Sequence, residues 1–192
     1  MNIIAGAGIF IYPLGLCSLL AVFIIVERLF SLRTNRVMPK NYVAAFIAGR
    51  LPSSDADDCS VVGRMVRFYK ENRPDPDALK AYAQLEVTHM ERGLYVLDII
   101  ISAAPLIGLL GTVAGLVQVF SNISLETGMP DPGTFVQGIA LALTTTLIGL
   151  SIAIPAIVGN RYLYRRVDKF TSQISVALER LIDLSKEDEA SA

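Results

Sequence analysis

Hydrophobic residues in this chain are concentrated in three long runs that contain no charged side chain. The runs cover residues 3–26, 99–125 and 132–160, and the turn between the last two holds Glu126 and Asp131. A membrane-spanning helix needs about 20 apolar residues, so each run is long enough to cross a bilayer. The pattern therefore predicts an all-α membrane protein with three transmembrane helices.

The first run, residues 3–26, is predicted to be a retained transmembrane helix rather than a signal peptide. A signal peptide begins with a basic segment and ends at a cleavage site flanked by small residues. Nothing basic precedes this run, and Glu27 and Arg28 follow it directly. Pro13 and Gly15 are candidate positions for a kink in this helix.

The polar segment after the first run is predicted to form a helical loop. It contains a turn-rich linker over residues 51–58, followed by apolar residues at helical spacing: Val61, Val62, Met65, Val66 and Tyr69. Further along, Asp75 can cap a new helix with Pro76 at its first position. No helix breaker is evident after that point, so one long helix is expected over residues 76–121, with Pro105 as its candidate kink.

The third helix is predicted to continue beyond residue 160 as a long extension. Its apolar residues are spaced 3, 4, 3, 4 and 3 apart: Val167, Phe170, Ile174, Ala177, Leu181 and Leu184. Two interpretations of this seam remain open, namely self-association of the extensions as a coiled coil and packing of an amphipathic helix on its own subunit. Residues 186–192 are expected to be a disordered acidic tail.

The basic residues predict the orientation of the chain in the membrane. All 17 Lys and Arg fall in two segments, with eleven over residues 28–92 and six over residues 161–186. Basic residues favour the cytoplasmic side, so the N-terminus and the turn after the second helix are expected on the other side. The expected organisation is a transmembrane helix over 1–30, a cytoplasmic helical loop over 31–97, transmembrane helices over 98–123 and 135–160 with an outer turn over 124–134 between them, and a cytoplasmic helix and tail over 161–192.

Composition excludes several classes of function. The chain has 192 residues, of which 53% are hydrophobic, and its mean hydropathy of +0.50 is too high for an ordinary soluble domain. Cys17 lies in an apolar run and Cys59 in a polar segment, and His89 is the single histidine, so neither a disulfide framework nor a zinc site is expected. No catalytic motif is present, and the glycines of residues 108–115 follow no strand and precede no lysine, which excludes a nucleotide-binding loop. The chain is therefore not expected to be an enzyme or to hold a cofactor.

Small residues and hydroxyl groups mark a candidate site on the last two runs. On the third run they step by 4, 4, 3 and 4 residues: Gly138, Ala142, Thr146, Gly149 and Ala153. On the second run they are Gly108, Gly111, Thr112 and Gly115, of which Gly111 and Gly115 form a GxxxG pair. One interpretation is helix packing alone, because small residues allow close helix contact. The other is that two hydroxyl-bearing faces line one shared axis.

No titratable group lies at mid-depth in these runs. Glu27, Arg28 and Asp98 are placed near the cytoplasmic membrane interface, where charged side chains can reach the headgroups. Proton relays inside membranes usually need an acidic group. If this chain conducts protons, another chain must supply that carboxylate.

The apolar runs resemble those of the MotA/TolQ/ExbB proton channel family over nearly the whole chain. Residues 104–115, Ala-Pro-Leu-Ile-Gly-Leu-Leu-Gly-Thr-Val-Ala-Gly, resemble the second-helix signature of the family. Residues 138–160, which include Ala-Ile-Pro-Ala at 153–156, resemble the third, and residues 26–30 are similar to the end of the first. Three spans are closer to ExbB and TolQ than to MotA, which has four.

The resemblance implies an assembly and a set of site residues. It implies a homopentamer around two copies of a single-span partner of the ExbD/TolR type, which carries the essential aspartate. Thr112 and Thr146 match the pore threonines of the family, and Pro155 belongs with the small residues that pack the pore bundle. Many members have a glutamate five residues before the third-helix threonine, and this chain has Leu141 there.

The function implied by the resemblance is that of a proton-channel subunit in a motor of the bacterial inner membrane. Such a motor would drive work in the periplasm or at the outer membrane, such as TonB-dependent uptake, with a TonB-like or TolA-like protein as a further partner. A non-conducting scaffold that anchors a single-span partner is the alternative. The system that is powered, and the choice between protons and sodium ions, stay open at this point.

Overall fold

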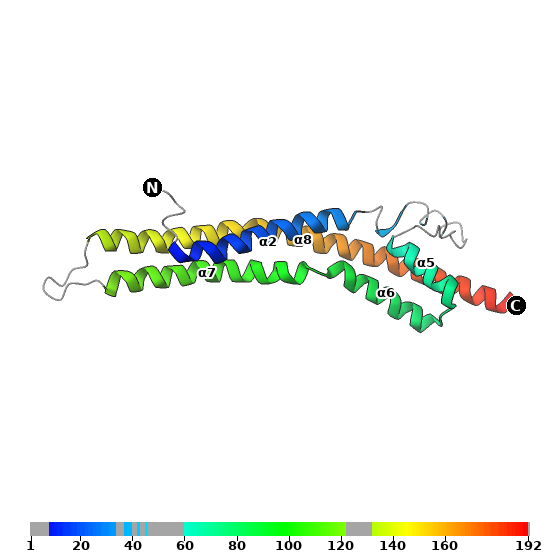
Figure 1. Cartoon of the computed structure of the whole chain (residues 1–192). Helices are drawn as coiled ribbons and strands as arrows, with labels where there is room; N and C mark the ends of the chain where they lie inside the picture. Colours follow the sequence, from blue (N-terminus) through cyan, green and yellow to red (C-terminus); the bar gives the residue numbers. More distant parts are fainter. Residues whose placement is uncertain are drawn as a thin grey trace. The chain divides into compact units, whose positions relative to one another are not determined.

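The computed structural model describes residues 8–33, 37–39, 42, 45, 60–121 and 132–191, with side chains up to residue 183. Every element within these ranges is a helix: η1 (Gly8–Phe10), α2 (Ile11–Ser31), α5 (Val61–Asn72), α6 (Pro76–Glu91), α7 (Leu94–Ser121) and α8 (Pro132–Ser191) (Figure 1). Three stretches of helix, which contain α2, α7 and α8, are long and apolar enough to cross a membrane, so the predicted all-helical class with three membrane-length helices is confirmed for the described residues. The predicted linker over 51–58 and most of the predicted outer turn lie outside the described residues.

The helices form two compact units. The first consists of Met1–Val26 and Gly93–Arg161, and the second of Glu27–Arg92 and Tyr162–Ala192. The first unit holds the three apolar runs, and the second holds most of the charged residues.

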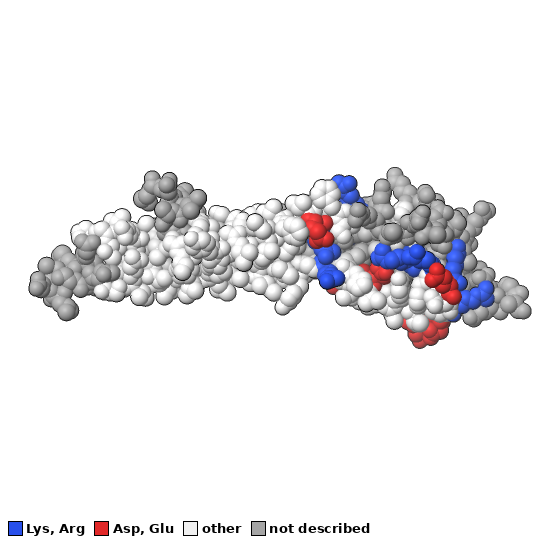
Figure 2. Space-filling view, viewed as in Figure 1, with Lys and Arg blue, Asp and Glu red and all other residues white. Residues whose placement is uncertain are grey.

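In the first unit, α2 and α7 each pack against the first part of α8 (Figure 1). Each helix buries one face and exposes large apolar side chains on the others, such as Leu106, Leu109 and Val113 on α7. Figure 2 shows this as a long surface without charged side chains over the apolar parts of α2 and α7. Apolar exposure on this scale is typical of helices covered by lipid or by other membrane helices.

The predicted single helix over residues 76–121 is wrong, because the chain breaks at Gly93. α6 ends at Glu91, and α7 begins at Leu94. Gly93 adopts φ +89°, a conformation that glycine reaches without the steric cost of a Cβ atom. The helix is instead continuous through Pro105, which lies inside α7. The glycine rather than a proline therefore separates the polar helix from the membrane-length helix.

The second unit contains the two polar helices predicted from the loop. Ser60 caps α5 by accepting a hydrogen bond from the Gly63 N–H at 3.0 Å. Asp75 caps α6 by accepting one from the Ala78 N–H at 3.2 Å, with Pro76 in the first turn, as the sequence predicted. Phe68 and Tyr82 stack with ring centroids 4.3 Å apart and join the two helices.

The extension of α8 settles the two interpretations of its apolar seam within the described residues. The seam side chains that are described are all buried inside the second unit: Val167, Phe170, Ile174, Ala177 and Leu181. The seam therefore packs on its own subunit, which leaves it unavailable for a coiled coil between extensions. The expected disorder of residues 186–192 is wrong for residues 186–191, since α8 remains helical to Ser191, and residue 192 lies outside the described residues. Glu, Lys and Ala are strong helix formers and can extend a helix that is already nucleated.

Candidate functional site

Backbone contact between α7 and α8 is the main feature of the first unit. A Cβ atom on Gly149 would lie 2.6 Å from the carbonyl oxygen of Ala104, and one on Gly108 would lie 2.9 Å from that of Thr145. A Cβ atom on Gly138 would lie 2.6 Å from the carbonyl oxygen of Gly115. Only glycine allows this separation, so the two small-residue stripes face each other within one subunit.

Thr145 lies at the centre of this contact, and sequence reasoning missed it. Its side chain is 0% exposed and fits beside Gly111, where a Cβ atom would approach the Thr145 Cβ to 2.5 Å. Its hydroxyl lies 2.8 Å from the Leu141 carbonyl oxygen in its own helix and 3.2 Å from that of Gly108 in α7. The single hydroxyl proton can serve either acceptor, so Thr145 can bind the two helices together.

The spacing of the buried positions explains why Thr145 was missed. Steps of 4, 3, 4 and 4 residues fit a helix as well as the predicted steps of 4, 4, 3 and 4. The buried stripe is Gly138, Ala142, Thr145, Gly149 and Ala153. Both adjacent threonines are therefore compatible with the period, and only the neighbouring helix distinguishes them.

Thr112 lies beside this contact, whereas Thr146 lies at its edge, where its hydroxyl reaches a carbonyl oxygen of α7. Both are half-buried. The Thr112 hydroxyl donates to the Leu109 carbonyl oxygen of its own helix at 2.7 Å. The Thr146 hydroxyl lies 3.3 Å from the carbonyl oxygens of Gly108 and Ala142. These bonds, of which the one from Thr146 to Gly108 crosses to α7, satisfy the hydroxyls while leaving each oxygen with acceptor capacity.

The antiparallel register separates the two threonines along the helix axis. Gly108 lies level with Thr145 and Gly115 with Gly138, so Thr112 lies level with residue 141. Thr146 is therefore about 7.5 Å away along the axis, at a rise of about 1.5 Å per residue. The two threonines therefore lie at different heights on one side of the α7–α8 pair and do not face each other directly.

Leu141 occupies the level of Thr112 with an apolar side chain. It is half-buried, and its Cδ1 atom lies 3.4 Å from the place of a Cβ on Gly8, so it is directed toward η1. Among the described residues of the first unit, the acidic side chain is Asp98 alone. The positions of Thr112 and Thr146 along the helix axis, which we call the threonine levels, therefore contain hydroxyls and no carboxylate among the described residues.

Asp98 lies at the other end of the apolar run, where it contacts α8. The Asn160 side-chain Nδ2 donates to the Asp98 Oδ1 at 2.6 Å, and Asn160 is 5% exposed. In the second unit, Glu27 and Arg28 form an ion pair with a 3.2 Å separation of Oε2 and Nε. All three charges border apolar runs in the sequence, and their place at a membrane interface stays a prediction.

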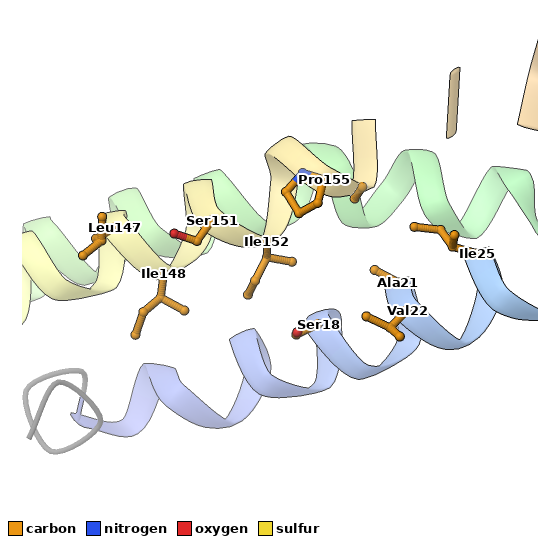
Figure 3. Close-up of a pocket in the computed structure, with 10 residues that line it drawn as sticks. Ser18, Ala21, Val22, Ile25, Leu147, Ile148, Ser151, Ile152 and Pro155 are labelled. Carbon is orange, nitrogen blue, oxygen red and sulfur yellow. The ribbon is translucent and has the colours of Figure 1, made fainter. Parts of the chain in front are cut away.

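Pro155 lies away from the contact of α7 and α8. It is exposed and lines a cavity of about 400 Å³ between α2 and α8 (Figure 3). Ser18 of α2 and Ser151 of α8 bring hydroxyl groups to a lining that is otherwise aliphatic. Figure 3 shows Ser18 on α2 and Ser151 on the facing helix α8 among the lining residues.

A charged cluster joins α5 and α6 in the second unit. The Arg64 Nε donates to the Glu86 Oε1 at 2.8 Å, Arg64 Nη2 contacts Glu86 Oε2, and the Tyr82 hydroxyl also donates to Glu86. Burial raises the pKa of Glu86, but hydrogen bonds from Arg64 and Tyr82 and the nearby positive charges outweigh it, so the pKa lies below its ordinary value. Burial and the Glu86 charge raise the pKa of Tyr82.

Replacing Glu86 with Gln should remove a pH-dependent part of the stability of the second unit. Because the folded-state pKa of Glu86 is lowered, its contribution is complete above the unfolded value near 4.5 and is lost as the pH falls further. Leaving Arg64 without its carboxylate should cost about 1–3 kcal/mol at neutral pH. Thermal unfolding between pH 7 and pH 3, compared with the exposed Glu91→Gln control on the same helix, tests this. Equal losses in the two variants would contradict it.

Comparison with known proteins decides the family. Residues 62–176 match the model of the MotA/TolQ/ExbB proton channel family, and this match spans more than half of the chain. The chain belongs to the MotA/TolQ/ExbB proton channel family. It is therefore a multi-pass membrane protein of a channel family rather than an enzyme.

Individual relatives are ExbB proteins. The chain is 26% identical over 190 residues to the biopolymer transport protein exbB1 of Vibrio cholerae, and this alignment covers 89% of this chain and 82% of that protein. It is 33% identical over 141 residues to ExbB of Helicobacter pylori, covering 72% and 93%. It is 32% identical over 206 residues to a putative ExbB-like protein of Synechocystis, covering 96% and 97%. This MotA/TolQ/ExbB family member is thus an ExbB-like biopolymer transport protein.

Proposed function

We propose that this chain is the channel subunit of a proton-driven motor in the bacterial inner membrane. One observation carries the proposal: the threonine levels of α7 and α8 hold hydroxyls, while the described residues of the first unit place no carboxylate there. Hydroxyls can solvate a proton-bearing water chain, but a relay usually needs an acidic group as well. The missing group is supplied by a single-span partner of the ExbD/TolR type with a membrane aspartate.

The proposed assembly follows the family resemblance. Five copies surround two partner helices, with the Thr112 and Thr146 sides of α7 and α8 toward them. The exposed apolar faces of α7 and α8 support further helix contacts, because one subunit leaves them uncovered. The complete segregation of Lys and Arg supports an N-terminus in the periplasm and a cytoplasmic C-terminus.

The proposed mechanism couples protonation to movement of the partner. A proton moves from periplasmic water to the partner's aspartate, which loses its charge and can then pass the apolar lining. Release to the cytoplasmic side restores the charge. One charge crossing 100 mV releases about 2.3 kcal/mol, which is enough to bias a step of rotation. That rotation would power work in the periplasm or at the outer membrane, such as TonB-dependent uptake through a TonB-like or TolA-like protein.

Proton flux in vesicles tests the proposal. The chain is co-reconstituted with its single-span partner, and an interior pH dye reports influx under an imposed potential. We expect influx that disappears when the partner's aspartate becomes Asn and falls with Thr146→Val. An intact complex that conducts no protons, even when the TonB-like or TolA-like protein is present, would contradict the channel assignment.

The competing function is a scaffold that anchors the partner without conducting. Dependence on the gradient separates the two, because a scaffold keeps working in cells whose proton gradient is collapsed while ATP is maintained. A motor subunit should stop at once under the same treatment. A scaffold should also tolerate replacement of its membrane hydroxyls by valine.

A further inference from the structure

The pair formed by Asp98 and Asn160 is a polar contact that the proposed threonine pathway does not use. Asp98 directly precedes the second apolar run, and Asn160 ends the third. Both belong to the first unit, and Asn160 Nδ2 donates to Asp98 Oδ1 at 2.6 Å. The pair therefore links α7 and α8 at the same end of both membrane-length helices.

The side-chain amide of Asn160 has an acceptor atom that makes no hydrogen bond. A carboxylate only accepts hydrogen bonds, so the nitrogen of Asn160 must face Asp98. The Asn160 Oδ1 atom is then buried without a hydrogen-bond partner, in a residue that is 5% exposed. A buried acceptor left unmatched is costly and calls for a donor such as a water molecule or the O–H of a protonated carboxyl. A simple clamp between helices needs no such acceptor.

The pair continues the same helix faces that carry the two threonines. Asp98 and Thr112 are 14 residues apart on α7, as are Thr146 and Asn160 on α8. Fourteen residues return to within about 40° of the same face and advance about 21 Å along the axis. Ser102 adds a hydroxyl one turn from Asp98 on that side of α7, where its side chain is exposed. Hydroxyls at one depth and a carboxyl–amide pair at the other thus lie along one side of the helix pair.

We infer that Asp98 and Asn160 form a second proton-relay station, at the end of the pathway that faces the cytoplasm. This inference rests on the proposed channel function. A proton that arrives through water along the threonine side binds the Asp98 carboxylate and makes it a carboxylic acid. The new O–H donates to Asn160 Oδ1 after the amide turns. Loss of the proton to cytoplasmic water restores the carboxylate, so no electrons move and no other bond changes. Asn160 acts as a positioning residue, because it holds the carboxyl in both protonation states.

The Asp98→Asn variant separates a relay from a clamp. An amide at this position still accepts the hydrogen bond from Asn160 but cannot take up the proton. We expect proton flux in co-reconstituted vesicles to fall about tenfold or more, since a positioned acid–base group commonly contributes about 10²–10⁴ to a rate. The melting temperature and the size of the complex should stay as in the unmodified protein. The exposed Asp168→Asn in the second unit is the matched control and should conduct normally.

A second variant keeps the test decisive if Asp98→Asn fails to assemble. Asp98→Glu retains the carboxyl but moves it by one methylene, so a relay should conduct with a shifted pH profile. A pH profile identical to that of the unmodified complex would overturn the relay. So would normal flux in an assembled Asp98→Asn complex while Thr146→Val still reduces conduction, and in that case the channel function survives. An unmodified complex that conducts nothing overturns the channel function, and the relay with it.

Discussion

The double variant Thr112→Val/Thr146→Val is expected to lose proton-driven work while keeping its assembly. Valine has the shape of threonine without the hydroxyl, so each half-buried site keeps its packing. On the proposed pathway the hydroxyl oxygens stabilise charge at the two positions, which lie about 7.5 Å apart along the axis. A hydrogen bond to a charged group contributes about 1.5–3 kcal/mol, so losing two such bonds should slow conduction roughly 100-fold or more.

Three measurements decide this prediction. Flux into vesicles and energised uptake in cells should both collapse, whereas size-exclusion chromatography should report an unchanged complex with the partner. Thr88→Val is the matched control, because Thr88 lies exposed on α6 and its hydroxyl bonds only the Gln84 carbonyl oxygen of its own helix. Normal uptake in the double variant would remove the threonines from the pathway.

Gly149→Ala is expected to destabilise the first unit strongly. The added Cβ would lie 2.6 Å from the Ala104 carbonyl oxygen, and this backbone atom cannot move without separating α7 from α8. Overpacking of this kind costs about 1–3 kcal/mol, and occasionally more. The melting temperature should fall by roughly 2–12 °C, at about 2–4 °C for each kcal/mol.

Gly15→Ala provides the matched control on α2. A Cβ on Gly15 meets nothing within 4 Å, so the substitution adds helix propensity without a clash. Its melting temperature should match or slightly exceed that of the unmodified protein. Equal destabilisation by the two substitutions would show that helix propensity, rather than contact between α7 and α8, sets the effect.

The chain itself specified most of the helices and the family. Three uncharged runs must become helices in a bilayer, because lipid offers no partner for an unbonded backbone group. The caps at Ser60 and Asp75 are local, since each involves a side chain and an N–H three residues away. The motifs around Thr112 and Thr146 carried the family likeness without any tertiary information.

Tertiary structure decided which residues meet. Thr145 and Thr146 are adjacent in a helix, and both fit the period of the small-residue stripe. Only the position of Gly111 on α7 selects Thr145 for burial. The break at Gly93 likewise depends on a φ angle that a glycine permits but does not require.

The contact between Asp98 and Asn160 shows most clearly what the sequence determines and what only the tertiary structure decides. The sequence placed each residue at one end of an apolar run, because the change between apolar and charged residues can be read directly from the sequence. It could not pair them, because they are 62 positions apart and their meeting depends on the antiparallel register of α7 and α8. That register follows from glycine backbones in contact at several levels, which is a property of two helices together and of neither alone.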